Sequence, residues 1–348
     1  MNPAEPGERD ARAERGRFSE DELLAAIRKV LSGPGPGVVA GPGDDAALVE
    51  VGSGHGVLTT DVLVEGVHFE RSLTSARDLG SKAIVANVSD VAAMGGSPRY
   101  AVVSLAFPRD VEAAWVMELY GGMRAACDEY ALSLVGGDLS AGAEVVVSVT
   151  VMGEVARGKA VFRSGASASE RVVVTGVLGA AAGGLALARA RLPSGVLGSD
   201  WARELLDAQF RPVARVGEGQ TLAQVGATAM MDVYDGLAID LSRLCAESGV
   251  GARVDLARVP VAPALRELAA VAPVDPLGLA LSGGEDYELL ATLDHHVVER
   301  ARSRLEERFG VPLADIGEIT EGEGLVAVGA DGTERPLEPK GWDHFGSR

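Results

Sequence analysis

Glycine stands beside a carboxylate in a series of turns along this chain, and each turn lies where a predicted strand ends. One such turn usually caps a helix or forms an Asx turn. Several together are harder to explain in that way, because neighbouring carboxylates repel one another unless cations neutralise them. Glycine also lets the backbone approach a ligand closely. The turns therefore predict a cation site, and they are GPGDDAAL (41–48), GGDLSAG (136–142), MMDVYDGLAID (230–240) and LSGGEDYELLATL (281–293).

The strand predicted at Val57–Val64 places three polar residues side by side, Thr59, Thr60 and Asp61. Two hydroxyls and a carboxylate are not needed for packing, whereas oxygen ligands in a row suit Mg²⁺. After the following turn the chain presents His68. A capping aspartate and a packed histidine are the simpler explanation when this stretch is taken alone. Ca²⁺ would also serve as the ion, although no EF-hand spacing is present.

A long helix is predicted from Ser75 to about Met94, and it carries Asn87 and Asp90 on one face because they are three residues apart. Asparagine and aspartate in mid-helix compete for backbone hydrogen bonds, so they are unfavourable there. Their presence favours a functional role, with a solvated helix face as the alternative.

Strands and helices alternate in both halves of the chain, which predicts an α/β (mixed α+β) fold. The 348 residues suffice for two domains with sizeable cores. The pattern changes in the basic stretch around Arg157, so we expect domains over residues 18–155 and 156–348. Residues 1–17 are charged and aperiodic, and we expect a disordered leader there.

The 32 basic and 50 acidic residues give a net charge of −18. This balance argues against binding to nucleic acid or to an anionic membrane, and it implies that phosphates would be held through bridging cations. Cys127 and Cys245 lie in helical patterns, which suits a structural role in a reducing compartment. Since no apolar run is long enough to span a membrane and no signal-peptide core is present, we expect a cytoplasmic protein.

The absence of several known catalytic motifs limits the reactions that this chain could catalyse. The chain contains no Walker A sequence, no protein-kinase motif set and no G-x-S-x-G. A carboxylate cluster without a nucleophilic side chain fits phosphoryl transfer, in which positioning and charge neutralisation dominate.

Eight motifs follow one another over nearly the whole chain: GDDAA (43–47), TTD with GVHF (59–69), NVSDVAAMGG (87–96), GGD (136–138), RSGA (163–166), DVYDGL (232–237), SGGEDYEL (282–289) and GWDHF (341–345). Together they closely resemble the motifs of the thiamine-monophosphate kinases. The resemblance implies the fold shared with aminoimidazole-ribonucleotide synthetase and selenophosphate synthetase. In that fold the N-terminal domain forms a homodimer through its sheet, and the C-terminal α/β domain closes the cleft. The implied reaction transfers phosphate from ATP to thiamine monophosphate with the help of several Mg²⁺ ions.

The resemblance also implies a role for individual residues. His68, Glu285 and Trp342 correspond to the thiamine-monophosphate site. Trp342 can stack on a heteroaromatic ring, and an acidic Glu285 suits the cationic thiazolium or the aminopyrimidine. No general base is required, because the attacking phosphate oxygen is already deprotonated near neutral pH. The implied nucleotide contacts are Gly137, Asp138, Arg163 and Tyr234, and the implied Mg²⁺ ligands are Asp45, Thr59, Thr60, Asp61, Asp90, Asp138, Asp232 and Asp235.

Three positions depart from the family pattern. Tyr234 replaces a serine that contacts the nucleotide, Leu139 replaces a threonine, and Ser169–Glu170 replaces Gly-Asp. Two alternatives therefore stay open. One is another ATP-using member of the superfamily, although the cysteines expected of a selenophosphate synthetase or a hydrogenase-maturation dehydratase are missing. The other is a non-catalytic nucleotide or metal sensor, which Tyr234 favours.

Overall fold

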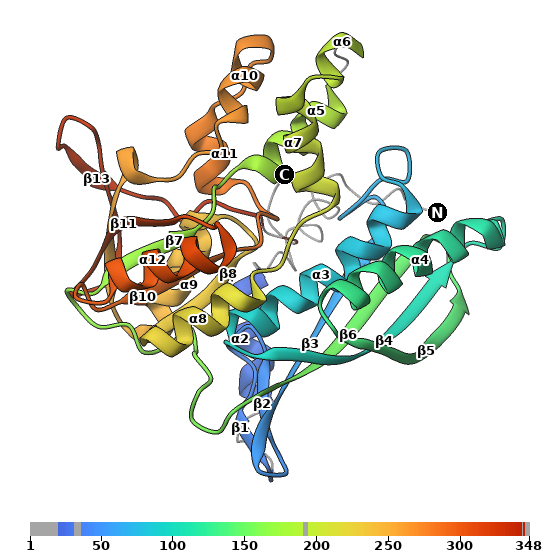
Figure 1. Ribbon diagram of the computed structural model, residues 1–348, viewed down its shortest axis with the longest axis horizontal. Helices are drawn as coiled ribbons and strands as arrows, with labels where there is room; N and C mark the ends of the chain where they lie inside the picture. Colours follow the sequence, from blue (N-terminus) through green and yellow to red (C-terminus); the bar gives the residue numbers. More distant parts are fainter. Residues whose placement is uncertain (1–19, 31–35, 191–193, 343, 345–348) are drawn as a thin grey trace, which may run out of the picture.

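The computed structural model describes residues 20–30, 36–190, 194–342 and 344, and it contains two sheets flanked by helices (Figure 1). The first sheet has six strands in the order β1-β2-β3-β6-β4-β5. Neighbouring strands are antiparallel except for β4 and β5, which are parallel. The strands are β1 (Val38–Ala40), β2 (Ala47–Val51), β3 (Gly54–Val64), β4 (Ser97–Phe107), β5 (Ser133–Ala141) and β6 (Val146–Val155).

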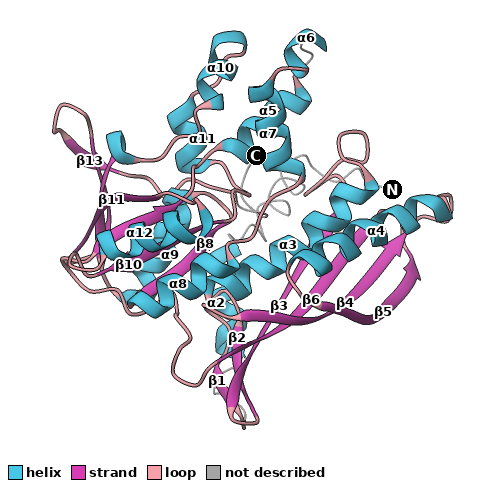
Figure 2. Ribbon diagram, in the orientation of Figure 1, coloured by secondary structure: helices cyan, strands magenta, loops and turns pink. Residues whose placement is uncertain are grey.

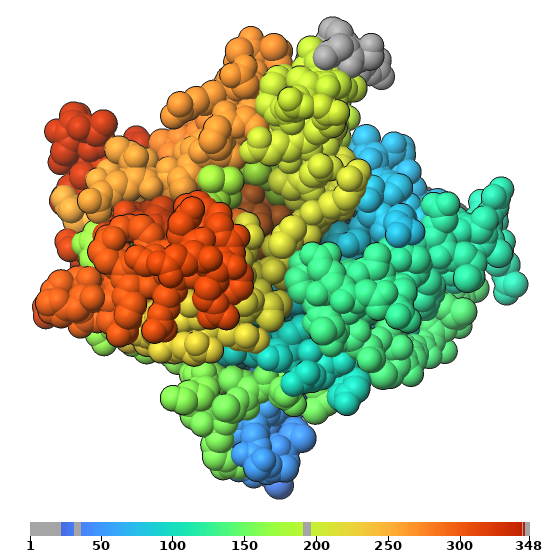
Figure 3. Space-filling model, viewed as in Figure 1, coloured from blue at the N-terminus to red at the C-terminus, as the bar shows by residue number. Residues whose placement is uncertain are grey.

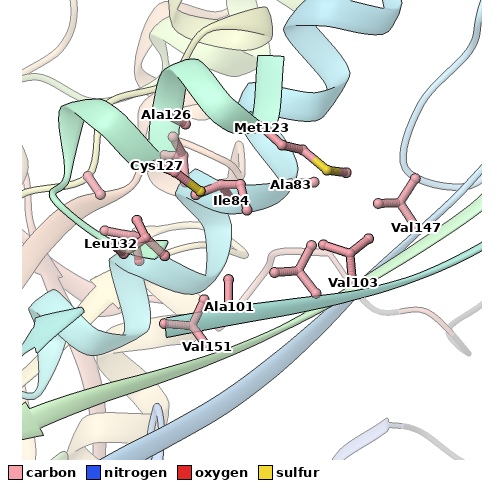
Figure 4. Packing of buried hydrophobic residues seen from close by; sticks show 14 of the residues in the cluster. Ala83, Ile84, Ala101, Val103, Met123, Ala126, Cys127, Leu132, Val147 and Val151 are labelled. Carbon is pink, nitrogen blue, oxygen red and sulfur yellow. The ribbon is translucent and has the colours of Figure 1, made fainter. Parts of the chain in front are cut away.

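Helices α3 (Ala76–Ala93) and α4 (Ala113–Glu129) cover one face of this sheet (Figure 2). Alternate residues of the strands point towards them, and Val103, Val147 and Val151 pack against the two helices (Figure 4). The opposite face of the sheet carries exposed apolar side chains, with Leu58, Val62, Tyr100 and Val102 each more than 40% exposed.

The second sheet has seven strands in the order β13-β12-β9-β11-β7-β10-β8. Its central strands are buried on both faces, so they are nearly continuous runs of apolar residues. The strands are β7 (Arg171–Thr175), β8 (Ala229–Val233), β9 (Gly251–Asp255), β10 (Glu288–Leu293), β11 (Leu313–Thr320), β12 (Gly324–Val328) and β13 (Glu334–Pro336). The other helices are α2 (Glu20–Val30), α5 (Ala180–Arg189), α6 (Ser194–Leu197), α7 (Asp200–Phe210), α8 (Val216–Val225), α9 (Leu237–Ser248), α10 (Ala264–Val271), α11 (Pro276–Ser282) and α12 (Val298–Phe309).

Helix α3 joins the two halves, which lie side by side in Figure 3. It contacts β3 in the first sheet and both α8 and the edge strand β8 in the second half. The approach to α8 is close, because a Cβ atom on Gly219 would lie 2.2 Å from the carbonyl oxygen of Ala92. Polar residues of α3 therefore meet side chains from both sheets.

Most expected elements are present, and the long helix at 75–94 and the strand containing Thr59–Asp61 are confirmed. The turn expected at 136–142 is wrong, because β5 runs on through the two glycines. Gly136 and Gly137 pair with Val102 and Val103 of β4. A Cβ atom on Gly137 would lie 1.9 Å from the carbonyl oxygen of Val103, so glycine here serves close strand pairing.

Helix α6 was not predicted from the sequence. Helices α8, α10 and α11 and strand β9 were not predicted. The proposed leader lies outside the described residues, and the domain boundary after residue 155 stays a prediction. Among the helices that the structure describes, none is long and apolar enough to cross a bilayer.

Candidate active site

Three carboxylates from distant parts of the chain meet in an acidic cluster, formed by Asp45, Asp90 and Asp232. One oxygen of each lies within 4.8 Å of the others. Asp45 precedes β2, Asp90 projects from α3, and Asp232 lies on the edge strand β8. This convergence is possible because α3 packs against both β3 and β8.

Neighbouring side chains hold each carboxylate in place. Thr59 donates a hydrogen bond of 2.5 Å to Asp90, and Ser89 donates one of 2.5 Å to Asp232. The Arg163 guanidinium donates to Asp45 over 2.7 Å. The acidic cluster is therefore positioned before any ligand arrives, and Thr59 contributes to it by orienting Asp90.

The carboxylates are crowded and largely removed from water. Burial, followed by repulsion from Asp61, raises the pKa of Asp90 well above its ordinary range. Burial and repulsion from Asp45 do the same to the pKa of Asp232. Burial and the charge of Asp235 raise the pKa of Asp61 to about 6. Such crowding is unfavourable unless protons or metal ions compensate it.

Unsatisfied polar atoms mark the same region. Buried side-chain atoms almost always have a hydrogen-bond partner, so exceptions call for an explanation. Of the five buried atoms without one among the described residues, Asp45 Oδ2 and Arg163 Nε lie at the acidic cluster. A carboxylate oxygen suits a hard cation and a guanidinium N–H suits a phosphate oxygen, so the donor set fits metal-bound phosphate.

A cavity of about 330 Å³ brings together the three residues expected to hold thiamine monophosphate, His68, Glu285 and Trp342. Asp235 also lines it and links it to the acidic cluster, because the charge of Asp235 raises the pKa of Asp61 and the charge of Asp61 raises the pKa of Asp90. The backbone N–H of Trp342 donates to the Asp235 carbonyl over 3.1 Å. Trp342 is 39% exposed, so it is not a core residue.

His68 faces this cavity as a neutral ring. Its Nδ1 accepts a hydrogen bond of 3.0 Å from the Val64 backbone N–H, which leaves the proton on Nε2. Burial and the nearby His344 lower the pKa of His68. The His68 and His344 ring centroids are 4.9 Å apart, so the cavity wall is aromatic on this side.

Two of the expected metal ligands lie away from the acidic cluster within one chain. Successive residues of a strand alternate between faces, so Thr60 points to the face opposite Thr59, where its hydroxyl donates to the Val149 carbonyl over 3.0 Å. Asp138 lies on the exposed edge strand β5. Paired residues connect it through Ser104 and Ser148 to Val62, a distance of about 14 Å at the usual strand spacing. The expected nucleotide contact Gly137 precedes it on the same strand.

The remaining expected residues lie close to the acidic cluster. The Asp235 carboxylate pairs with Arg243 over 2.5 Å. Tyr234 lines the cavity, and its ring centroid is 5.7 Å from that of Tyr287. Burial and the charge of Asp61 raise the pKa of Tyr234 well above its ordinary value, so it stays a neutral donor.

Sequence reasoning missed Asp240 and Asp44. Asp240 accepts hydrogen bonds of 3.0 to 3.1 Å from the backbone N–H groups of Tyr234, Asp235 and Gly236, so it fixes the turn after β8. An aspartate in the first turn of a helix is the signal that could have indicated it. Asp44 accepts from the Arg163 backbone N–H over 3.0 Å and so anchors the segment that carries the guanidinium.

It also missed Lys82, which lies on α3 and is only 5% exposed. Its Nζ lies 2.8 Å from Glu285 Oε1. The second Glu285 oxygen accepts from Gln209 Nε2 over 2.7 Å. The Glu285 charge is therefore already balanced by a protein cation, and its expected contact with the thiazolium or the aminopyrimidine stays a prediction.

The fold is that of the proteins related to aminoimidazole-ribonucleotide (AIR) synthase. Residues 43–155 match the family described as AIR synthase related protein, N-terminal domain, and residues 168–329 match its C-terminal domain. A thiamine-monophosphate kinase of Aquifex aeolicus is 38% identical over 303 residues, covering 87% of this chain and 92% of that protein. The chain therefore belongs to the thiamine-monophosphate kinase family, and it is a kinase.

Solved structures agree with this assignment. The structure described as AaThiL complexed with AMPPCP and TMP superposes with a TM-score of 0.80 at 35% identity, over 94% of this chain and 97% of that one. Hydrogenase maturation protein HypE has a TM-score of 0.67 at 22% identity, over 84% of this chain and 91% of that one, which indicates a shared fold alone.

Proposed function

We propose that this kinase transfers the terminal phosphate of ATP to thiamine monophosphate, giving ADP and thiamine diphosphate. The observation that carries the proposal is the junction of the acidic cluster with the cavity that contains His68, Glu285 and Trp342. A related structure is described as containing an ATP analogue and TMP, which supports the same pair of substrates.

Asp45, Asp90 and Asp232 would hold Mg²⁺, with Asp61 and Asp235 beside them. Bound Mg²⁺ supplies positive charge that lets two anionic phosphates approach each other. Arg163 would support the phosphates from the Asp45 side, where its Nε has no partner in the part of the chain that the structure describes. The protein needs no general base, because the acceptor is a phosphate oxygen.

The cavity would orient thiamine monophosphate, the substrate that accepts the phosphate. Trp342, Tyr234 and His68 offer ring faces and edges to the thiamine rings, while the Lys82–Glu285 pair keeps that wall close to neutral. The phosphate of thiamine monophosphate would then extend past Asp235 towards the acidic cluster. Holding both reactants in line lowers the entropic part of the barrier.

A second copy of the chain would complete this site. Strand β2 pairs with β3 only as far as Leu58. Beyond that point, the edge of β3 that faces away from β6 has no neighbouring strand among the described residues, from Thr59 to Val64. The outer edge of β5 is likewise open, and the face between them carries the exposed apolar side chains named above. We infer a homodimer in which β5 of the partner approaches β3 and brings its Asp138 and Gly137 to Thr60 and Asp61.

The direct test of the proposed function is turnover. With ATP, Mg²⁺ and thiamine monophosphate, the purified protein should form ADP and thiamine diphosphate in equal amounts. ADP formation without thiamine diphosphate, or binding of both substrates without reaction, would favour the sensor alternative and overturn the proposal.

We expect Mg²⁺ to raise the melting temperature of the protein, and to do so more at about pH 7.5 than at about pH 5. Because burial raises the folded-state pKa of Asp61 from 3.8 to about 6, the folded protein binds more protons than the unfolded chain between about pH 4 and 6. Without metal, stability therefore falls as pH rises through this range. Differential scanning calorimetry in EDTA and in Mg²⁺ measures both effects. If Mg²⁺ does not raise the melting temperature at about pH 7.5, the acidic cluster is not a metal site.

We expect Trp342→Ala to raise the KM for thiamine monophosphate by about ten- to a hundredfold, with the KM for ATP nearly unchanged. The half-exposed ring lines the cavity, so its loss removes stacking rather than core packing. Steady-state kinetics should show Trp342→Phe retaining most of the affinity. A lower melting temperature with normal binding would instead identify Trp342 as a packing residue.

A further inference from the structure

A buried hydrogen-bond acceptor faces the cavity that the proposed function assigns to thiamine monophosphate. It is Oε1 of Gln209, near the end of α7, and it has no hydrogen-bond partner among the described residues, although Gln209 is only 3% exposed and lines the cavity. A buried amide oxygen without a partner is costly, so a ligand that donates a hydrogen bond would recover that cost.

The orientation of this amide is set by its neighbours. Gln209 Nε2 donates to Glu285 Oε2 over 2.7 Å, and an ionised carboxylate can only accept. Turning the amide over would bring its oxygen against the carboxylate oxygen, which is unfavourable. The oxygen is therefore directed away from Glu285 and left available.

Lys82 keeps this arrangement together from the other half of the molecule. Its Nζ lies 2.8 Å from Glu285 Oε1 and donates to the Gln209 backbone carbonyl over 3.0 Å. Lys82 comes from α3, whereas Gln209 and Glu285 belong to the half that carries the second sheet. Its ammonium group pairs with one oxygen of the Glu285 carboxylate, and the other oxygen of that carboxylate orients the amide.

The surrounding backbone holds Gln209 and Glu285 in fixed positions. A Cβ atom on Gly184 of α5 would lie 2.8 Å from Gln209 Cβ, so α5 packs directly against this residue. Glu285 adopts a φ of +68°, which is uncommon for a residue other than glycine, and its N–H donates to the Tyr234 carbonyl over 2.6 Å. Both members of the pair are therefore held in fixed positions.

We propose that Gln209 is a specificity-determining residue whose Oε1 accepts a hydrogen bond from an amino group on the ring system of the acceptor substrate, with Lys82 and Glu285 as its positioning residues. This inference rests on the proposed function. For thiamine monophosphate, the donor is the exocyclic amino group of the pyrimidine. A substrate with a carbonyl at that position places two acceptors opposite each other and is rejected.

The test compares thiamine monophosphate with oxythiamine monophosphate, in which a carbonyl replaces that amino group. The wild-type protein should favour the amino compound in kcat/KM by about thirtyfold or more, since a site built to hydrogen-bond a group strongly rejects an analogue without it. Gln209→Met should reduce this ratio to within about threefold of one, by lowering kcat/KM for the amino compound only.

Three further variants separate recognition from general structural damage. Lys82→Met should lose most of the discrimination, and Lys82→Arg should restore it because it keeps the charge. Gln224→Met, on the exposed surface of α8, is the matched control and should keep the wild-type ratio. If Gln209→Met retains the wild-type ratio while both substrates react more slowly, the residue is only structural and the inference is wrong. If the wild-type protein phosphorylates neither compound, the proposed function itself fails.

Discussion

Asp90→Asn is expected to lower kcat for thiamine diphosphate formation by at least about a thousandfold, roughly 4 kcal/mol of transition-state stabilisation. The asparagine keeps the shape of the side chain and can still accept the hydrogen bond from Thr59. It removes one charge from a cluster whose only expected role is to bind metal. Rapid quench or coupled assays of ADP formation measure the loss.

The same substitution should leave the metal-free protein at least as stable as the wild type. Burial and repulsion from Asp61 raise the pKa of Asp90, so a neutral side chain relieves an unfavourable charge. Calorimetry in EDTA should therefore show an unchanged or higher melting temperature. Asp128→Asn is the matched control, since Asp128 is exposed and forms an ion pair with Arg124 on α4, away from the acidic cluster. Wild-type turnover in Asp90→Asn would show that the cluster is structural.

Asp61→Asn and Asp138→Asn should each nearly abolish turnover, but a mixture of the two inactive proteins should recover activity after subunit exchange. If the Asp138 of one chain serves the Asp61 of its partner, each mixed dimer contains one site with both aspartates intact. Random exchange gives half mixed dimers, so about a quarter of the wild-type activity should return.

No recovery is expected if both aspartates act within one chain, because each site of a mixed dimer then lacks one of them. A tagged copy of one variant is needed to verify that subunits exchange. Two batches of Asp61→Asn mixed with each other are the negative control for recovery of activity. Absence of recovery in verified mixed dimers would contradict the contribution of the partner. Full activity in either single variant would remove that aspartate from the mechanism.

The parts of the site carried by local patterns could be predicted from the sequence. Thr59 and Asp61 interrupt an apolar strand, and Asp90 stands in mid-helix beside Asn87, so each is locally unfavourable and indicates a role. The structure brings Asp90 together with Asp45 and Asp232. His68, Glu285 and Trp342 were expected to share a site, and they line one cavity.

Other features depend on contacts between distant segments. Lys82 and Gln209 lie in ordinary helical patterns 127 positions apart, and their meeting follows from how α3 packs against the second half. The turn at 136–142 was misread because a Gly-Gly-Asp run is typical of turns, whereas here parallel pairing with β4 requires the glycines. Asp138 consequently lies on an edge strand, where a single chain gives it no part in the acidic cluster.

A crystal structure of this protein with AMPPCP, thiamine monophosphate and Mg²⁺ tests the central claim most directly. We expect Mg²⁺ within about 2.0–2.2 Å of oxygens of Asp45, Asp90 and Asp232. The thiamine rings should lie between Trp342 and His68, with the substrate phosphate directed towards the γ-phosphate of the analogue. Metal bound elsewhere with the acidic cluster protonated, or thiamine monophosphate outside this cavity, would contradict the account.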